Sequence, residues 1–331
     1  MSTTDLQKQF YTRIEKELFD LNLPDHPVTL YEPFEYALKA GGKRIRPIFT
    51  MLACGICKGN IEESIPAALA VEILHNFTLV HDDIMDSADT RRGKPSVFNK
   101  WNENVAILSG DVMFAGAMQQ LVYYGHNDAF SKEEFSALYD VFLKAIITVC
   151  EGQALDMEFV DRQNIELQEY IEMISGKTAA LLSGSLEMGA IVAHSSKLQR
   201  QELDLIGKEI GIAFQIQDDL LDAIADPEKF GKKPGGDIFE GKKTYLTILA
   251  LERANKKESE LITETLFSNH PSLESVEAVL KLMKDLNVIK DVSSEIELRY
   301  QKAFELLSHF PSSEYKEELK NLLTFLRYRD H

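Results

Sequence analysis

Cysteine is scarce in this chain of 331 residues, which contains only Cys54, Cys57 and Cys150. So small and odd a set excludes a disulfide framework and agrees with a reducing compartment. Proline and glycine are also few, at 10 and 18 residues. No Pro/Gly/Ser-rich linker, low-complexity tract or fixed-period repeat divides the chain, so we expect one domain over residues 1–331.

Long apolar runs and excess positive charge are missing as well. No eighteen consecutive residues are apolar, and residues 1–10 lack an apolar signal core. We therefore expect a cytoplasmic protein without a transmembrane segment. Lysine and arginine together number 36 against 53 acidic residues, and the formal net charge of -17 argues against a general nucleic-acid surface. In such a chain, clusters of basic residues become informative.

Helical periodicity, in contrast, runs through most of the chain. Apolar residues recur at three- to four-residue spacing, for example at Leu69, Ile73, Phe77 and Val80. Alternating strand patterns are scarce. The stretches 64–80 and 178–194 carry almost no charge, so we expect these two helices at the centre of a bundle. The pattern predicts an all-α protein of roughly ten or more helices.

Two short acidic motifs follow apolar helical stretches. In HDDIMD the pair Asp82 and Asp86 is four residues apart, as is the pair Asp218 and Asp222 in QDDLLD, so each pair lies on one helix face. One such motif is easily a solvated surface. Two of them at the ends of core helices need a compensating cation. Oxygen ligands without a Cys/His cluster favour magnesium over zinc, shared with the phosphates of a substrate.

Basic residues gather in three glycine-containing segments, GGKRIRP, RRGKP and EKFGKKPGGDIFEGKKT. Their members are Lys43, Arg44, Arg46, Arg91, Arg92, Lys94, Lys229, Lys232, Lys233, Lys242 and Lys243. Each alone is more readily a solvated surface charge. Together with two carboxylate motifs in an acidic chain, they predict a diphosphate-binding site.

Six patterns follow one another along the chain: GGKRIRP (41–47), LHNFTLVHDDIMDSADTRRGKPS (74–96), GQALDM (152–157), GKTAAL (176–181), FQIQDDLLD (214–222), and FGKKPGGD with GKKT (230–237, 241–244). In type and order they resemble the trans-isoprenyl diphosphate synthase (polyprenyl synthetase) family. The resemblance implies an isoprenoid synthase-like bundle around a central substrate cavity. It also implies a head-to-tail prenyltransferase that condenses isopentenyl diphosphate with allylic diphosphates, and a homodimer.

The resemblance further assigns roles to individual residues. A trinuclear magnesium cluster would be held by Asp82, Asp86 and Asp218, with support from Asp83 and Asp222. Isopentenyl diphosphate would be bound by Lys43, Arg46, His75 and Arg92, and the allylic diphosphate by Arg91, Lys177, Lys232 and Lys242. Thr178 and Gln215 would line the reacting carbons, and the loop around 228–243 would be a lid. On the residues alone, His75 is more readily a core histidine and Thr178 as readily a packing residue.

Product length is predicted from Phe77. It precedes Asp82 by five residues, about 7.5 Å along a helix, and would form a floor beneath the growing chain. In the family an aromatic residue here accompanies short products. With Thr78 beside it and only two residues between the last two aspartates of the motif, the pattern resembles archaeal geranylgeranyl enzymes. We expect geranylgeranyl diphosphate, with farnesyl diphosphate a close second; ordinary core packing is the alternative role for Phe77.

Two other functions stay open. A terpene cyclase of the same fold would also ionise a diphosphate, but it would not need the basic residues of GGKRIRP and RRG. A non-catalytic subunit of a prenyl synthase would bind without turnover, but both acidic motifs and the basic residues of the lid are intact. A requirement for isopentenyl diphosphate, and activity of the protein alone, would distinguish these possibilities.

Overall fold

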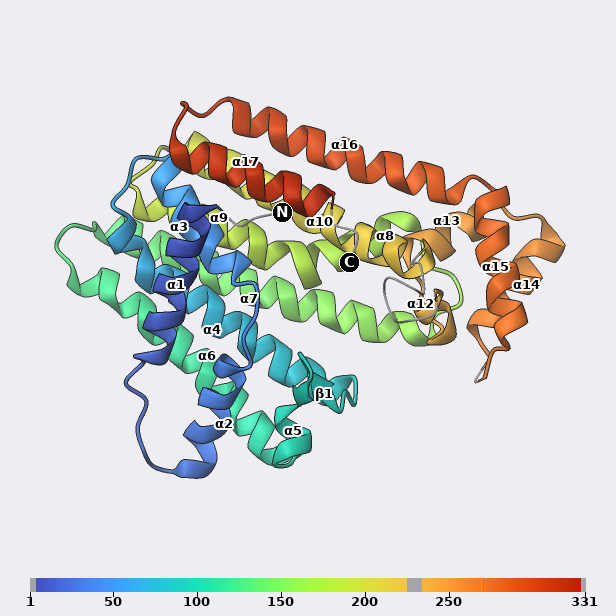
Figure 1. Ribbon diagram of the computed structural model, residues 1–331, viewed down its shortest axis with the longest axis horizontal. Coiled ribbons are helices and arrows are strands. Elements are labelled where there is room, and N and C mark those ends of the chain that lie inside the picture. Colours follow the sequence, from blue (N-terminus) through green and yellow to red (C-terminus); the bar gives the residue numbers. More distant parts are fainter. Residues whose placement is uncertain (1–3, 225–233, 269, 329–331) are drawn as a thin grey trace. The chain divides into compact units, whose positions relative to one another are not determined.

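The computed structural model describes residues 4–224, 234–268 and 270–328. Over these residues helices dominate, and the only strands are the two of one short hairpin, β1 (Thr90–Arg91) and β2 (Lys94–Pro95) (Figure 1). The prediction of an all-α protein is therefore confirmed.

The chain divides into two compact units. The first contains Met1–Ile146, Leu181–Asp204 and Phe310–Leu319. Its helices are α1 (Asp5–Phe19), α2 (Val28–Lys39), α3 (Ile45–Ile56), α4 (Ile61–Met85), α5 (Val97–Lys100), α6 (Glu103–His126) and all but the first residue of α9 (Ala180–Val192).

The second unit contains Ile147–Ala180, Leu205–His309 and Lys320–His331. Its helices are α8 (Leu167–Ile174), the π-helical segment η1 (Ser175–Ala179), α12 (Gly236–Phe239), α13 (Tyr245–Arg253), α14 (Lys256–Leu266), α15 (Leu273–Asp285) and α16 (Val288–Ser308). Residues of both units occur in α7 (Lys132–Asp161), α10 (Lys197–Ile224) and α17 (Glu314–Arg327).

Helix α4 is the central helix of the first unit and packs against α3 and α6 (Figure 1). Its N-cap Asn60 accepts a hydrogen bond from the backbone of Glu62, and acidic residues in the first turn suit the positive end of the helix. Most side chains from Ser64 to Leu74 are buried, because this stretch is apolar on all sides. The prediction that 64–80 and 178–194 form core helices is confirmed, since α9 is also buried almost throughout.

Helix α6 is the one helix in the described ranges that is long and apolar enough to cross a membrane by length and composition. Its 18-residue window has a mean hydropathy of 1.4, and 33% of that window is buried. Large apolar side chains such as Leu108 and Val122 are exposed on it. The expected absence of a transmembrane segment stays a prediction.

In the second unit, the C-terminal helices hold the helix that carries the second acidic motif. The side-chain amide of Gln217 on α10 donates to the backbone oxygen of Arg327 on α17, at 3.1 Å, and its oxygen accepts from Tyr300 of α16. Arg327 also forms an ion pair with Glu297 of α16. The C-terminal third thus packs against α10.

Candidate active site

The first acidic motif lies at the C-terminal end of α4. Asp82 and Asp83 fall in the last turn and Asp86 is the C-cap residue, while that turn contains no basic residue. Asp82 is half-buried and Asp86 is exposed, whereas only 2% of the surface of Asp83 is exposed. The C-terminal end of a helix carries partial negative charge, which makes carboxylates there unfavourable unless a cation compensates them. The end of α4 is therefore suited to bind a cation.

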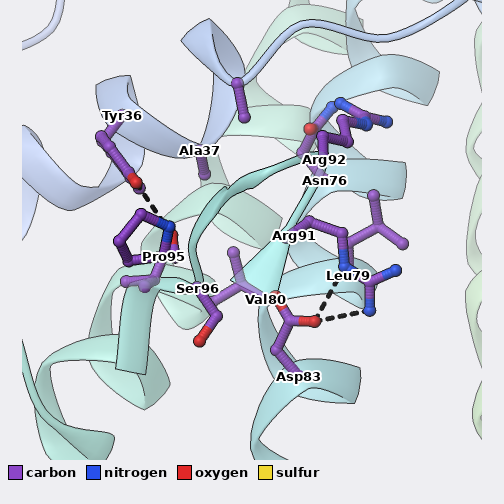
Figure 2. A pocket seen from close by; sticks show the side chains of 12 residues that line it. Tyr36, Ala37, Asn76, Leu79, Val80, Asp83, Arg91, Arg92, Pro95 and Ser96 are labelled. Carbon is purple, nitrogen blue, oxygen red and sulfur yellow. Dashed lines mark hydrogen bonds and ion pairs between the residues drawn. The ribbon is translucent and has the colours of Figure 1, made fainter. Parts of the chain in front are cut away.

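The buried carboxylate of this motif is paired with the β hairpin. Arg91 donates through Nε and Nη2 to Oδ1 of Asp83, at 2.8 and 2.5 Å, and Figure 2 shows the two side chains pointing toward each other. Burial raises the pKa of Asp83, and the neighbouring guanidinium of Arg91 opposes this rise. Asp83, a predicted supporting metal ligand, and Arg91, predicted to bind the allylic diphosphate, thus bind each other.

The hairpin turn directs the second arginine the other way. Its two residues, Arg92 and Gly93, have φ values of 53° and 73°, which is the geometry of a type I′ turn. Arg92 donates through Nη1 to the carbonyl oxygen of Gly41. Gly42 has a φ of 143°, and a Cβ there would lie 2.8 Å from Cζ of Arg92. Glycine is therefore favoured at Gly42 by its backbone conformation, and a Cβ there would require the guanidinium group of Arg92 to shift.

Three residues predicted to bind isopentenyl diphosphate come together in the first unit. Nη1 of Arg46 lies 3.1 Å from Nε2 of His75 and donates to it. Burial, followed by the positive charges of Arg46 and Arg92, holds the pKa of His75 well below its usual range, so its imidazole is neutral at pH 7. Burial lowers the pKa of Arg46 to about 10, and its buried Nε has no partner. The fourth, Lys43, is exposed on the adjoining loop.

Phe77 begins a row of aromatic rings in the first unit. Its ring centroid lies 5.7 Å from that of Phe114 on α6, which in turn lies 6.4 Å from Phe142 on α7. His81 contacts the ring of Phe77 edge-on at 4.8 Å. Phe77 is half-buried while Phe142 is buried. The opposing helices that sequence reasoning left unnamed thus contribute Phe114 and Phe142 next to Phe77.

The second unit brings together the two residues predicted to line the reacting carbons. Thr178 donates to Oε1 of Gln215 at 2.9 Å. Thr178 and Lys177 lie in η1, and π-helical turns are frequent at functional sites. A Cβ on Gly152 would lie 2.1 Å from the backbone nitrogen of Lys177, so glycine lets α7 approach η1 closely. Lys177 itself forms an ion pair with Asp156 at 2.6 Å.

The second acidic motif also buries its middle residue. Asp218 is half-buried, whereas Asp219 has only 6% of its surface exposed. The carboxylate of Asp219 accepts hydrogen bonds from the hydroxyl of Tyr170, from Nε2 of Gln215 at 3.3 Å and from the backbone of Tyr245 at 3.3 Å. Burial raises the pKa of Asp219 to about 7 despite these donors. The motif is thereby tied to the Thr178–Gln215 pair.

The last aspartate of this motif contacts the segment that begins α12. Oδ2 of Asp222 accepts from the backbone nitrogen of Asp237 at 2.9 Å. Burial, and then the charge of Asp222, raises the pKa of Asp237 to about 6. Lys242, predicted to bind the allylic diphosphate, forms ion pairs with Asp237 at 3.5 Å and Glu240 at 2.6 Å.

Part of the expected lid lies outside the described residues. The structure resumes at Pro234, and the lysines outside it are Lys229, Lys232 and Lys233. The prediction for Lys232 therefore stays a prediction.

The chemistry of the donors suits a hard cation. Asp82 and Asp86 offer carboxylate oxygens at a helix end without a basic residue, and magnesium typically takes one or two carboxylates together with waters and substrate phosphates. Within the described ranges, no three acidic, histidine or cysteine side chains form a ready-made metal cage. The magnesium ligands stay predictions.

Sequence reasoning missed several residues that shape these sites. Glu72 is buried in α4 and contacts Arg44, and it is the one charged residue of the apolar stretch 64–80. That isolation was a signal for a functional or paired carboxylate. Tyr170 and Asp237 gave no such signal, because their contacts with the second acidic motif join segments distant in the sequence.

Comparisons with known proteins agree with the motifs and the helical fold. The family model described as polyprenyl synthetase matches residues 27–283. A short chain isoprenyl diphosphate synthase of Methanocaldococcus jannaschii is 40% identical over 277 residues, which are 84% of this chain and 82% of the relative. A geranylgeranyl diphosphate synthase of Sulfolobus acidocaldarius is 40% identical over 80% of this chain and 78% of its own.

Solved structures give the same answer for the fold. The crystal structure of geranylgeranyl pyrophosphate synthetase from Pyrococcus horikoshii matches with a TM-score of 0.90 and 34% identity, over 98% of this chain and 100% of that chain. The fold is therefore the all-α isoprenoid synthase fold. With a family model that covers most of the sequence, and with relatives at 40% identity, the chain belongs to the polyprenyl synthetase family of prenyltransferases.

Proposed function

We propose that this protein condenses isopentenyl diphosphate head to tail with allylic diphosphates and releases a short-chain all-trans prenyl diphosphate. The observation that carries the proposal is the cluster of Arg46, Arg92 and neutral His75, the last of which lies on the helix that ends in the first acidic motif. Such a cluster suits a second, non-ionising diphosphate substrate, which a terpene cyclase does not need. Membership of the family and the names of the relatives support the same reaction.

The basic residues divide between the two substrates. Isopentenyl diphosphate is bound by Lys43, Arg46, His75 and Arg92, and the allylic diphosphate by Arg91, Lys177, Lys232 and Lys242. Lys177 and Lys242 are paired with carboxylates of this chain. When the allylic diphosphate binds, each lysine therefore exchanges its carboxylate partner for a phosphate oxygen. Arginine forks and lysine ammonium groups then stabilise the charge that grows on the departing diphosphate.

Magnesium is the cofactor in this proposal. Asp82, Asp86 and Asp218 would hold a trinuclear cluster, with Asp83 and Asp222 in support. When bound, magnesium supplies electrostatic stabilisation of the diphosphate leaving group. The protein contributes a water-poor surface around the allylic cation, where Thr178 and Gln215 present oxygen dipoles to the reacting carbons. The released diphosphate accepts the proton lost in the last step.

Turnover of the purified protein tests the reaction. The assay contains magnesium and isopentenyl diphosphate, with each of the allylic primers in turn, and the products are separated by chain length. We expect condensation by the protein alone. Turnover of an allylic diphosphate without isopentenyl diphosphate would favour the terpene cyclase, and activity only with a partner chain would favour the non-catalytic subunit.

Geranylgeranyl diphosphate is the proposed main product, with farnesyl diphosphate second. We place the floor of the product site at Phe77, supported by Phe114 and Phe142 behind it. Phe77→Ala should therefore shift the products to longer chains. Phe10→Ala removes a buried ring that stacks on Tyr315 and serves as control, with an unchanged distribution. Equal product lengths in both variants would show that Phe77 is ordinary core packing, and only ten-carbon or forty-carbon products from the wild type would refute the length proposal.

The protein is proposed to be a cytoplasmic homodimer with one polyprenyl synthetase domain over residues 1–331. The exposed apolar residues of α6, such as Leu108 and Val122, support a partner surface. Size-exclusion chromatography with light scattering measures the mass in solution, and a mass of one chain, 37.5 kDa, would contradict the dimer.

A further inference from the structure

The first unit contains a fully buried ion pair directly beside the proposed diphosphate pocket. Nη1 of Arg44 lies 2.5 Å from Oε1 of Glu72, and their side chains are only 1% and 2% exposed. Sequence reasoning counted Arg44 among the diphosphate cations of GGKRIRP, but the structure buries it against α4. Removing two charges from water costs several kcal/mol per ion, and a well-packed apolar pair is often as stable. Stability alone therefore does not account for this pair.

Arg44 anchors the loop that precedes α3. Its Nε donates to Glu15 of α1 at 2.6 Å, and its Nη2 donates to the carbonyl oxygen of Leu38 in α2 at 2.6 Å. With the contact to Glu72, all three guanidinium nitrogens are engaged. The backbone of Arg44 has a φ of 48°, in the left-handed region that a residue with a side chain adopts at a steric cost. These contacts thus hold a strained backbone between Lys43 and Arg46.

Glu72 is built into the helix that carries the other half of the pocket. It precedes His75 by three residues, so the two lie on neighbouring positions of one helix face. Asn76 fixes its carboxylate by donating to Oε1 at 3.0 Å. The negative charge of Glu72 also raises the pKa of Arg46 and of Arg92, against the lowering that burial causes. One buried carboxylate therefore acts on every arginine of the pocket.

We infer that Glu72 and Arg44 are positioning residues for isopentenyl diphosphate: their buried ion pair fixes the loop of Lys43 and Arg46 against the helix of His75. The inference rests on the proposed function, and it assigns to the pair no contact with substrate. Arg46 and Arg92 keep their positive charge for the incoming diphosphate beside neutral His75, because Arg44 is the arginine that Glu72 contacts directly. A preorganised pocket loses less free energy in ordering its side chains when the substrate binds.

The test replaces the pair by apolar residues, in Arg44→Met with Glu72→Leu. Because the double variant replaces both residues, neither is left as a buried charge without the other, and the fold is expected to persist. KM for isopentenyl diphosphate should rise about 10-fold or more, as for residues that orient ligands from behind. KM for the allylic diphosphate and kcat should each change less than about threefold, because Arg91, Lys177 and the acidic motifs are untouched.

A second ion pair in the chain gives the matched control. Arg299 and Glu209 are 3.0 Å apart with side chains 13% and 20% exposed, and neither belongs to the pocket. Arg299→Met with Glu209→Leu should leave both KM values within about twofold. Glu72→Gln alone, which preserves the volume of the side chain, should give the same selective rise in KM and is the variant to measure if the double variant does not fold.

The outcomes separate the inference from the function on which it rests. The inference alone would be overturned if the wild type consumes isopentenyl diphosphate but the variants show no selective rise in KM for it. No selective rise means that this KM is unchanged or rises no more than KM for the allylic diphosphate. A wild type that does not consume isopentenyl diphosphate would overturn both. The inference stands if the rise is confined to isopentenyl diphosphate and absent from the control.

Discussion

The two acidic motifs of this chain, HDDIMD in the first unit and QDDLLD in the second, share the spacing of their aspartates but differ in the partners of the middle aspartate. In both, the middle aspartate is the buried one, while the first is half-buried. Asp83 is paired with the guanidinium of Arg91. Asp219 instead accepts hydrogen bonds from the hydroxyl of Tyr170 and the amide of Gln215, which are neutral groups.

This difference separates two tasks of a buried carboxylate. Burial raises the pKa of both middle aspartates, but Arg91 opposes the rise at Asp83, whereas Asp219, with neutral donors alone, reaches about 7. The first carboxylate fixes a cationic hairpin beside the end of α4. The second orders the Thr178–Gln215 pair. In each motif the first and last aspartates are the outer ones, and they remain the proposed metal ligands.

Exchanging an outer aspartate should have the largest effect on activity. Asp86 is exposed, so Asp86→Asn should change the free energy of unfolding by no more than about 0.5 kcal/mol. As a lost metal ligand it should lower kcat/KM by about 10²–10³-fold. Asp89→Asn, an exposed acid in the same segment, is the control for turnover and thermal unfolding. Similar rates in the two variants would contradict a ligand role for Asp86.

Breaking the ion pair between Asp83 and Arg91 should have a smaller effect on activity. Asp83→Asn removes the ion pair with Arg91, which is 36% exposed, so we expect a loss of about 1–2 kcal/mol in the free energy of unfolding. Because the arginine is no longer fixed, kcat/KM for the allylic substrate should fall about 10–100-fold. Adding Arg91→Gln should change little more, since both substitutions remove one interaction. Fully additive losses in steady-state kinetics would mean that the two residues act separately.

Much of the first unit follows from local pattern. The apolar stretch 64–80 predicts a core helix, and the spacing of Asp82 and Asp86 predicts that they share one face, because both depend only on the 3.6-residue period. The glycine after Arg91 and Arg92 marks a turn, and the structure forms a hairpin there. Helix class and motif position were therefore accessible from the sequence.

The partner that each charged side chain contacts could not be predicted in this way. Arg44 and Arg46 stand two residues apart in one basic segment, yet Arg44 is buried against Glu72 while Arg46 contacts His75. Both contacts join residues about thirty positions apart, and local periodicity carries no information on such pairs. Tyr170 likewise reaches Asp219 across 49 positions. What distinguishes a structural charge from a substrate-binding one is thus its long-range partner.

Asp219 and its neutral hydrogen-bond donors should affect the free energy of unfolding more than the turnover rate. The pKa of Asp219 is raised to about 7 in the fold, against about 3.9 in an unfolded chain. A raised carboxyl pKa contributes stability that is fully present below about pH 4 and is lost as the pH rises through 7. Asp219→Asn removes this titration, so between pH 4 and 8 the free energy of unfolding of the variant should gain about 3–4 kcal/mol relative to the wild type, one pKa unit being worth about 1.4 kcal/mol. Urea unfolding of the metal-free protein at several pH values measures the difference, with Asp89→Asn as the reference that should run parallel to the wild type. A difference that does not change with pH would mean that the donors Tyr170 and Gln215 keep Asp219 ionised, and that the two motifs are electrostatically alike after all.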